Sequence, residues 1–432
     1  MGRKLSCFSL FAVITALVTL NALRGAPLWH LEKNFLEVSS HGEENDIYYS
    51  SSSERNANYG GEDDDHWEVI EPTGEEEGKL EERMGEGESV EEETTKGEKG
   101  KEGITEGEAK EGEETKEHQP QNTKKQKVIL LWTSWRSGST FLGELLRRVS
   151  NKTFYSYEPL HMYHINVFDK KENDDTLIPP VVLLRDLLSC NFEAHSNLVK
   201  YQKKKRWYLL ANKYLGKTCR RRGHLGMKVD CSSPLYVGGM CRSANVHLIK
   251  VLRLSLRWAR TFLENKSLDF QILYLARDPR AVLSSRTKLK WCNTPMCRNP
   301  NVTCSHLAGD LAEASGLQRE FPERFKFLHY DKICQDMTTS LADIMNFLGL
   351  PVQQEQIDLL KFKETSDKKF SIFKNSLLQA QLWRSNTPFQ GIVQPVQNSC
   401  ESSLEKLGLR IFQTEKELLD LSVPVLERPS KL

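Results

Sequence analysis

The sequence predicts an α/β protein with a central parallel sheet, carried on one N-terminal membrane helix and a disordered acidic stem. Two segments support the α/β fold, because residues 127–149 and 270–286 each contain a buried strand, a short polar loop and a helix. Charge segregation is the third observation. Residues 41–120 hold 28 acidic and 8 basic residues, whereas residues 121–432 hold 48 basic and 29 acidic residues. We therefore expect a basic body that attracts anionic ligands, rather than one compact domain.

The N-terminus has the pattern of a signal anchor. Residues 5–23 are apolar and uncharged, and a helix of nineteen residues spans roughly 28 Å, about the core of a bilayer. Arg3 and Lys4 precede this run, which predicts a cytoplasmic tail at 1–4 and a lumenal remainder. A cleaved signal peptide is the alternative, but the run is longer than a usual signal core and no clear cleavage site follows it.

Residues 24–126 form the predicted stem. Most of it is rich in Glu, Gly, Lys and Ser, and it has too few large apolar side chains to offset the entropy of the chain. We expect it to be disordered and to hold the body, residues 127–432, away from the membrane. An alternative is that the acidic stem folds back on the basic body as a decoy anion.

Cysteines and glycosylation sequons favour a lumenal compartment. Nine of the ten cysteines lie in the body, and none has the paired CxxC spacing of a zinc ribbon, so no metal site is expected. Sequons at Asn151, Asn265 and Asn301 are the expected glycosylation sites. Behind a hydrophobic N-terminus, these features indicate a compartment in which disulfides form.

The first strand–loop–helix unit has the pattern of an anion site. VILLWTS (128–134) predicts a strand buried on both faces, and FLGELLRRV (141–149) has apolar residues at helical spacing. The loop WRSGST (135–140) between them brings Arg136, several hydroxyls and a helix N-terminus together. It is no Walker A motif and contains no lysine, which disfavours a nucleoside triphosphatase. A plain turn whose Ser139 or Thr140 caps the helix is the alternative.

The second unit has the same order. Phe270 to Ala276 predicts a strand, and Pro279 suits the first turn of the helix that follows RDPR. Arg277 emerges at the carboxyl end of the strand, where open α/β sheets bind ligands, and an arginine with a nearby serine can hold a phosphate. A surface Arg–Asp pair with capping serines is the alternative, but two such units in one basic domain are much less common.

Together the two motifs resemble a known family. TSWRSGSTFLGELL resembles the 5′-phosphosulfate loop of Golgi carbohydrate sulfotransferases, and LYLARDPRAVLSSR resembles their 3′-phosphate motif. The resemblance covers about residues 127–412 and is strongest to the branch that sulfates carbon-6 hydroxyls of galactose, N-acetylgalactosamine or N-acetylglucosamine. Further landmarks are YSYEPLH (155–161), CSSPL (231–235), HLIKVLRL (247–254) and QLWRS (381–385).

The resemblance implies a P-loop-like sulfotransferase fold in a single-pass type II Golgi membrane protein. The donor would be 3′-phosphoadenosine 5′-phosphosulfate, with no metal. The acceptor would be a glycosaminoglycan or an N- or O-linked glycan, and no nucleic acid partner is expected. The implied donor-binding residues are those of the two motifs: Trp135, Arg136, Ser137, Gly138, Ser139, Thr140, Phe141, Arg277, Asp278, Pro279, Arg280, Ala281, Val282, Leu283, Ser284 and Ser285.

The resemblance also suggests catalytic roles. Arg136 would neutralise charge that develops on the sulfuryl group. Glu158 is the expected base for the acceptor hydroxyl, and His161 is the alternative, because a neutral imidazole is also a competent base. Glu158 has a second possible role as a structural partner of a nearby arginine.

The chain departs from the family in three places. HYDKI (329–333) stands where the family often has Arg-Tyr-Glu-Asp on a later strand, so His329 replaces the arginine and Asp331 the glutamate. His161 and His164 are displaced from the usual histidine spacing. Residues 291–304 form an insert with three cysteines of its own.

The stretch 200–224 is the most basic of the body and interleaves aromatic residues that can stack on sugars, namely Tyr201, Trp207, Tyr208 and Tyr214. A solvated basic face is the alternative.

An inactive glycan-binding protein is the alternative function, against which the intact motifs argue. Absent Walker and kinase signatures disfavour a phosphotransferase. The sequence leaves the sugar, the disulfide pairs and the oligomeric state open.

Overall fold

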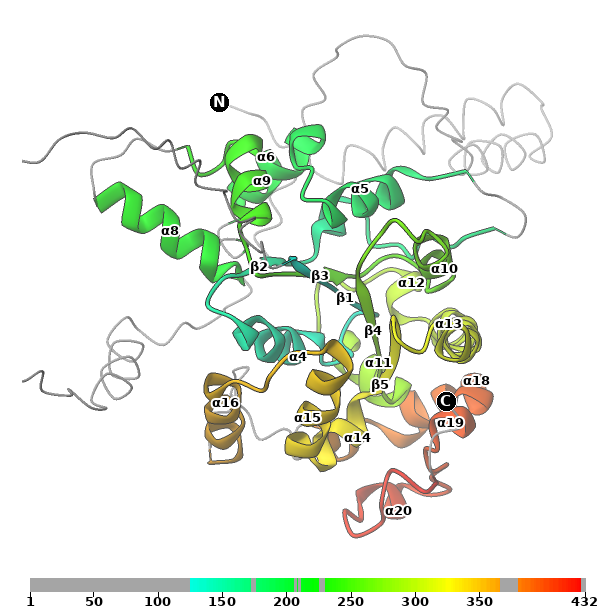
Figure 1. The fold of residues 1–432 in the computed structure, drawn as a ribbon. Helices are drawn as coiled ribbons and strands as arrows, with labels where there is room; N and C mark the ends of the chain where they lie inside the picture. Colours follow the sequence, from blue (N-terminus) through cyan, green and yellow to red (C-terminus); the bar gives the residue numbers. More distant parts are fainter. Residues whose placement is uncertain are drawn as a thin grey trace, which may run out of the picture. The chain divides into compact units, whose positions relative to one another are not determined.

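The computed structural model describes residues 125–171, 176–205, 208, 211–224, 230–365 and 380–428. Its centre is one parallel sheet with strand order β2-β3-β1-β4-β5 (Figure 1). The strands are β1 (Lys127–Thr133), β2 (Thr153–Ser156), β3 (Val246–Val251), β4 (Gln271–Ala276) and β5 (Phe325–His329). The predicted α/β fold with a central parallel sheet is confirmed.

Helices cover both faces of the sheet, because its strands are apolar on both faces. In β1, Ile129 and Leu131 belong to the core on one face, which contains residues of α4, α15 and α16. Leu130 and Trp132 belong to the core on the other face, which contains residues of α5, α10 and α13. The central strand is therefore buried from both sides, and its carboxyl end is held at a fixed place.

The helices up to β4 are α4 (Ser139–Leu146), α5 (Pro179–Leu188), α6 (Ser196–Lys204), α8 (Lys213–His224), α9 (Pro234–Arg242) and α10 (Arg257–Leu263). After β4 come α11 (Pro279–Thr287), α12 (Pro295–Arg298), α13 (Pro300–Glu320), α14 (Tyr330–Gln335), α15 (Met337–Leu348), α16 (Gln354–Thr365), α18 (Gln394–Ser399), α19 (Glu401–Leu407) and α20 (Glu415–Leu419). Short turns of other helix types are η1 (Arg147–Val149), η2 (Pro159–Met162), η3 (Glu193–His195), η4 (Arg384–Asn386) and η5 (Phe389–Val393).

The predicted tail at 1–4, the signal anchor at 5–23 and residues 24–124 of the stem lie outside the described residues. Residues 125 and 126, which the prediction assigned to the stem, are attached to the body. Lys125 forms an ion pair with Asp269, and Gln126 Nε2 donates to the carbonyl oxygen of Cys241 over 2.6 Å. Within the described part of the chain, no helix combines the length and the hydropathy needed to cross a bilayer.

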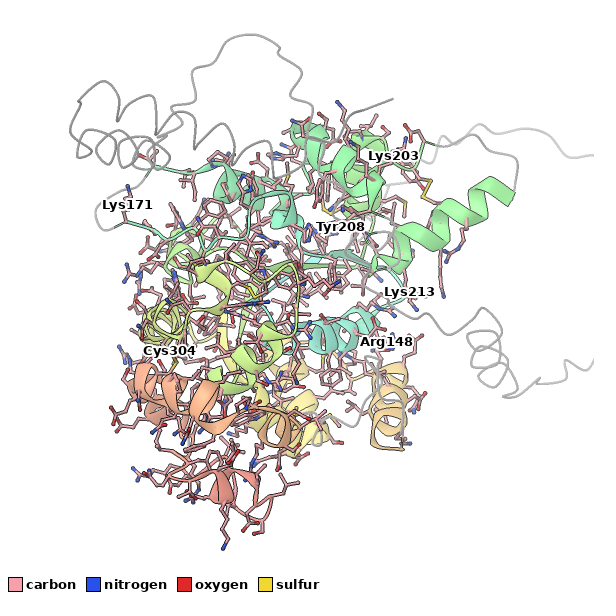
Figure 2. All side chains as sticks on the ribbon, turned by 180° about the vertical axis from the view of Figure 1, so that it is seen from behind. Arg148, Lys171, Lys203, Tyr208, Lys213 and Cys304 are labelled. Carbon is pink, nitrogen blue, oxygen red and sulfur yellow. A yellow bond between two sulfur atoms is a disulfide. The ribbon has the colours of Figure 1, made fainter. Side chains whose placement is uncertain are left out.

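Four disulfides join the cysteines whose pairing the sequence left open: Cys190–Cys241, Cys219–Cys231, Cys292–Cys297 and Cys304–Cys400. Cys292–Cys297 closes the predicted insert on itself. Cys304, labelled in Figure 2, ties α13 to the segment that begins α19. Asn151, Asn265 and Asn301 are exposed at the surface, so their glycosylation remains a prediction with accessible acceptor sites.

His247 lies on β3 with its ring fully buried. Its Nδ1 is 3.4 Å from the sulfur of Cys241, and its Nε2 is 2.9 Å from Ser156 Oγ. His247, Cys190 and Cys241 have the proximity of metal ligands, but the two sulfurs are bonded to each other, so neither is a thiolate ligand. Burial lowers the pKa of His247 to about 3.

We expect this histidine to make folding depend on pH. The folded protein keeps His247 neutral down to about pH 3, whereas the unfolded chain protonates it near pH 6.5. Because the unfolded state binds the additional proton, the free energy of unfolding should fall as pH drops through this window, by up to about 1.4 kcal/mol per pH unit. Urea unfolding between pH 4.5 and pH 7 should show a shallower slope for His247→Asn. The exposed residue His164 offers the control His164→Gln, and an unchanged slope in His247→Asn would contradict the assignment.

Candidate active site

The first loop turns sharply between β1 and α4. Arg136 and Gly138 have left-handed backbone conformations, with φ of 70° and 91°. A Cβ atom at Gly138 would lie 2.1 Å from Cε2 of Tyr330 on α14, so the loop packs directly on that ring. The helix begins at Ser139 and ends at Leu146, two residues before and three residues short of the predicted bounds. The predicted order of strand, loop and helix is confirmed.

The second motif lies beside the first, because β1 and β4 are hydrogen-bonded neighbours. Arg136 Nε donates to Ser285 Oγ over 2.9 Å, and Arg277 Nη1 donates to the carbonyl oxygen of Arg136 over 3.2 Å. The Arg277 guanidinium also covers the Tyr330 ring at 4.6 Å. Burial lowers the pKa of Arg136, and the charge of Arg277 lowers it further. Two guanidinium groups are thus crowded together, as in a site that binds an anion.

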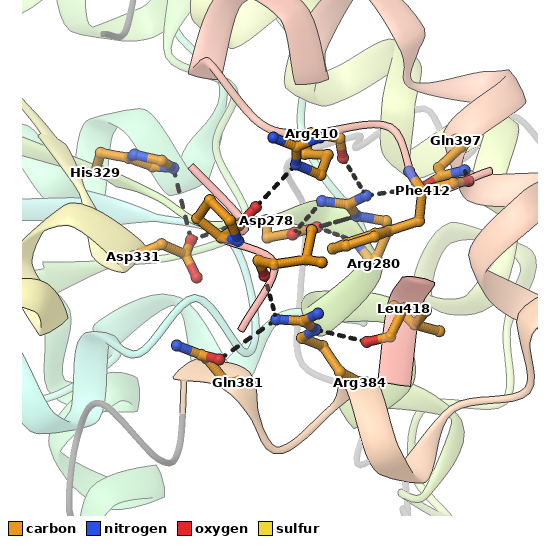
Figure 3. A network of polar contacts seen from close by, with 12 residues as sticks. Asp278, Arg280, His329, Asp331, Gln381, Arg384, Gln397, Arg410, Phe412 and Leu418 are labelled. Carbon is orange, nitrogen blue, oxygen red and sulfur yellow. Dashed lines mark hydrogen bonds and ion pairs between the residues drawn. The ribbon is translucent and has the colours of Figure 1, made fainter. Parts of the chain in front are cut away.

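Most of the second motif supports this site from inside the protein. Arg280 and Asp278 form a fully buried ion pair of 2.8 Å, and Arg280 also donates to Gln397 Oε1 over 2.8 Å (Figure 3). Ser284 shares a hydrogen bond of 2.5 Å with Thr387. Pro279, Ala281, Val282 and Leu283 are buried as well. The side chains from Asp278 to Ser284 are therefore engaged within the fold, whereas Arg277 and Ser285 reach the first loop.

A third arginine reaches the first loop and was not singled out from the sequence. Arg286 Nε and Nη2 both donate to the carbonyl oxygen of Trp135, over 3.2 and 3.0 Å. Burial lowers the pKa of Arg286 to about 9. The sequence offered one signal for this residue, which is that Arg286 follows RDPR by about two turns of the predicted helix.

The departure at 329–333 has a structural explanation. His329 is the last residue of β5, and the next four residues are on α14, so the segment begins at the end of a strand and continues into a helix. Asp331 Oδ2 accepts a hydrogen bond from the backbone N–H of Asp278 over 3.0 Å and lies 3.5 Å from His329 Nε2. Burial raises the pKa of Asp331, while the charge of His329 opposes the rise. Tyr330 thus packs against the first motif at Gly138, and Asp331 bonds to the second motif at Asp278.

Glu158 lies just beyond β2 with a left-handed backbone, φ 47°. Its carboxylate is 2.8 Å from Lys250 Nζ and 3.9 Å from Arg253 Nη1. Burial raises the pKa of Glu158, but the charges of Lys250 and Arg253 outweigh burial and hold it below its ordinary value. Glu158 is therefore an ionised carboxylate whose main partner is a lysine rather than the expected arginine.

Lys250 is a residue of the candidate site that the sequence analysis did not single out. It is buried on β3, where its Nζ also donates to Thr140 Oγ1 over 3.3 Å and lies 4.2 Å from the Tyr157 ring. Although burial lowers it, the charge of Glu158 raises the pKa of Lys250 above its ordinary value. One ammonium group thus joins the first turn of α4 to Glu158. A lysine inside the otherwise apolar strand pattern HLIKV of the run HLIKVLRL was the signal.

His161 lies next to Glu158, on η2. Its Nδ1 is 2.5 Å from the hydroxyl of Tyr201 on α6, and burial together with the charge of Arg253 lowers the pKa of His161 to about 4. The imidazole is therefore neutral near pH 6 to 7 and able to accept a proton. His164, by contrast, is exposed.

The basic stretch divides between the site and the surface. Tyr208, labelled in Figure 2, donates to the carbonyl oxygen of Glu158 over 3.0 Å. Tyr214 bonds to Ser243 instead, and Trp207 lies outside the described residues. Lys203 and other lysines of α6 are exposed, as the solvated alternative expects.

Backbone strain is concentrated at this site. Four non-glycine residues in the described part of the chain have positive φ, and Arg136, Glu158 and Arg253 are three of them. Such conformations cost of order 1–3 kcal/mol each and persist where the surrounding structure imposes them, often at functional sites. The three residues therefore mark one constrained group at the carboxyl edge of the sheet.

The chain is similar to known proteins across this region. A family model described as "Sulfotransferase domain" matches residues 126–391, which include both motifs. The chain is 24% identical to carbohydrate sulfotransferase 1 of Homo sapiens, covering 71% of this chain and 85% of that protein. It is 26% identical to carbohydrate sulfotransferase 5 of Mus musculus, covering 69% and 84%. Among solved structures, the sulfotransferase domain of the Synechococcus PCC 7002 olefin synthase is 17% identical, with a TM-score of 0.35, covering 66% and 97%.

We expect Gly138→Ala to destabilise the fold by about 2–4 kcal/mol, because it combines a left-handed backbone with overpacking against Tyr330. The measurement is the midpoint of urea unfolding. Gly309, inside α13, has open space around its Cβ position, so Gly309→Ala is the control and should be neutral or stabilising. Equal effects of the two substitutions would show that the loop does not depend on its contact with Tyr330.

Proposed function

The chain belongs to the sulfotransferase family, and from that premise we propose that it transfers a sulfuryl group from 3′-phosphoadenosine 5′-phosphosulfate to a sugar hydroxyl. The acceptor position is carbon 6 of galactose, N-acetylgalactosamine or N-acetylglucosamine, in a glycosaminoglycan or a glycoprotein glycan. The hydrogen bond from Arg136 to Ser285 carries the proposal, because it brings the two anion-binding loops to one place. The names of the relatives, all carbohydrate sulfotransferases, support a sugar acceptor.

Two parts of the site bind different groups of the donor. Arg277 and Ser285 bind the 3′-phosphate through charge-assisted hydrogen bonds. The loop from Trp135 to Phe141 and the N-terminus of α4 bind the 5′-phosphosulfate. The buried residues from Asp278 to Ser284 contribute by holding Arg277 and Ser285 in register.

Transfer breaks the bond between sulfur and the bridging oxygen of the donor and forms a bond from sulfur to the sugar oxygen. The negative charge that collects on the bridging oxygen needs preorganised donors. Arg136 supplies one positive charge, and Lys250 supplies a second from the side of Thr140. Both groups are already held in place by protein contacts, so little reorganisation is needed as charge develops.

The proton of the sugar hydroxyl passes to a base that lies just after β2. Glu158 is the proposed base, and His161 is the alternative. Glu158 is ionised but bound to Lys250, which weakens it as a base. His161 is neutral over the same pH range. Both residues border the site, so substitution must decide between them.

The location follows from the same features. We infer a type II Golgi membrane protein, anchored by residues 5–23, with the body in the lumen. Four disulfides and three exposed sequons support a lumenal body. The inactive glycan-binding alternative has no observation in its favour, because both motifs are intact and adjacent.

The function is tested by incubating the full chain with sulfur-labelled donor and a panel of desulfated glycans, followed by mapping of the sulfate. We expect label on carbon 6 of one acceptor class. Arg136→Ala should lower turnover on every acceptor, by roughly 10²–10³-fold if it removes one transition-state donor. Arg185, an exposed arginine paired with Asp186, provides the control Arg185→Gln. The proposal would be overturned by a folded protein that binds 3′-phosphoadenosine 5′-phosphate, the product left by the donor, but transfers label to no glycan.

Glu158→Gln should lower turnover by roughly 10²–10⁴-fold, the usual loss for a missing general base, and leave affinity for 3′-phosphoadenosine 5′-phosphate near wild type. The amide keeps the shape but leaves Lys250 without its ion pair, so unfolding measurements must accompany the kinetics. If His161 is the base, His161→Ala will show this large loss instead. Wild-type activity would then fall as pH drops through about 4, where the imidazole protonates.

A further inference from the structure

Three buried donors beside the first loop have no hydrogen-bond partner among the residues that the structure describes. They are Nε and Nη1 of Arg253 and Nε1 of Trp135. Both side chains are only 6% exposed. The nearest carboxylate oxygen to Arg253 Nη1, on Glu158, is 3.9 Å away, beyond hydrogen-bond length. Buried donors of folded proteins are nearly always paired, so this group indicates a ligand that supplies acceptor oxygens.

Arg253 and Trp135 line the same cavity, whose volume is about 50 Å³. It lies at the carboxyl ends of β1 and β4, and α13 closes it with Thr303, His306 and Asp310. A water needs on the order of 10–15 Å³ of such volume, so the cavity has room for a small oxyanion group but not for a sugar ring. The ligand is therefore a charged substituent of a larger molecule, with the rest of that molecule outside.

The charges around the cavity favour an anion. Arg277 and Arg286 line it together with Arg253. Arg286 is committed to the carbonyl oxygens of Trp135 and Cys297 and to Thr303, whereas Arg253 keeps two donors for a ligand. The one carboxyl group of the lining, Asp310, accepts from the backbone N–H of Leu256 over 2.8 Å, and burial raises its pKa to about 7. The cavity thus has excess positive charge.

The position of Arg253 points to the acceptor rather than the donor. Arg253 interacts electrostatically with Glu158, the proposed base, and with Tyr208 and Tyr201 beside it. The 5′-phosphosulfate of the donor is assigned to the loop from Trp135 to Phe141 and to α4, and the 3′-phosphate to Arg277 and Ser285. Among the described residues, Arg253 forms no hydrogen bond to this donor site, and its guanidinium meets the loop at the Trp135 ring, 5.5 Å away.

We propose that Arg253 and Trp135 bind an anionic oxygen group, a carboxylate or a sulfate, on the acceptor glycan next to the sugar that receives the sulfuryl group. This inference rests on the proposed function and deepens it, since it makes the enzyme selective for glycans that are already acidic. Arg253 supplies the charge and a charge-assisted hydrogen bond, and Trp135 supplies a further donor.

The test compares three matched disaccharides that share the same acceptor sugar. The sugar next to the acceptor differs among the three. It is a uronic acid in the first, the neutral carboxyl-reduced form of that uronic acid in the second, and the same reduced form carrying one sulfate in the third. We expect wild-type kcat/KM to be at least about tenfold higher for one acidic disaccharide than for the neutral one, and the better arm identifies carboxylate or sulfate. Equal kcat/KM for all three would overturn the inference without any variant.

Variants then locate the selectivity. Arg253→Gln should reduce the acidic-to-neutral ratio by about tenfold or more, Arg253→Lys should restore part of it, and Trp135→Phe should reduce it less. Arg185→Gln removes a positive charge from an exposed ion pair and should keep the wild-type ratio. A wild-type ratio in folded Arg253→Gln would overturn the assignment. If that variant does not fold, Arg253→Lys and Trp135→Phe decide in the same way.

Binding without reaction separates this inference from the proposed function. The affinity of each disaccharide is measured on the full chain in the presence of 3′-phosphoadenosine 5′-phosphate, where no transfer occurs. Preferential binding of an acidic disaccharide that depends on Arg253 supports the anion site even if no sugar is labelled in the transfer assay. Transfer to sugars without such a preference would overturn the anion site alone.

Discussion

The fully buried ion pair between Asp278 and Arg280 organises the candidate site. The ion pair lies at the turn from β4 to α11. It thereby holds in place Arg277, which precedes it, and Ser285, which follows on α11. Breaking such a pair by removing one partner typically costs about 3–5 kcal/mol, because the remaining charge is buried alone. The Arg280 guanidinium also lies between the rings of Trp383 and Phe412, at 5.1 and 5.0 Å. A second buried arginine, Arg384, lies over the same Phe412 ring at 4.9 Å and donates to the carbonyl oxygen of Leu418 over 2.7 Å (Figure 3).

This arrangement separates charges that build the fold from charges that face the ligands. Arg280 and Arg384 both donate to several acceptors, so their hydrogen-bonding groups are satisfied within the protein. Arg136 and Arg277 instead lie close to each other, and Glu158, a carboxylate that interacts with Arg136, is paired with Lys250. The edge of the sheet therefore has more cations than its own carboxylates neutralise. An anionic donor and an acidic acceptor would both relieve that excess, and the positive body would draw them in.

Local patterns in the sequence were sufficient to predict the two strand–loop–helix units. An apolar run of strand length, a loop with glycine or proline and a helical period are properties of neighbouring residues, and β1 and β4 differ from their predicted bounds by one residue. The resemblance to a family then indicated that the two loops bind the anionic groups of the donor, which is what we propose. The roles of Lys250, Arg253 and Arg286 depend on contacts between distant parts of the chain, which periodicity does not encode. Ser284 and Arg280 were expected to face the donor because they share a motif with Arg277, yet the helical period turns them inward.

The C-terminal residues have a consequence for the order in which the molecule matures. Gln397 and Phe412 complete the surroundings of Arg280, and Cys304–Cys400 fastens the same segment to α13. Both loop motifs are synthesised long before these residues leave the ribosome. A nascent or truncated chain that contains every recognisable motif would still lack the acceptors that hold the second loop in place. The complete donor site is thus a product of the finished, oxidised polypeptide, and a gene fragment that ends after the motifs would encode a recognisable family member without a properly supported site.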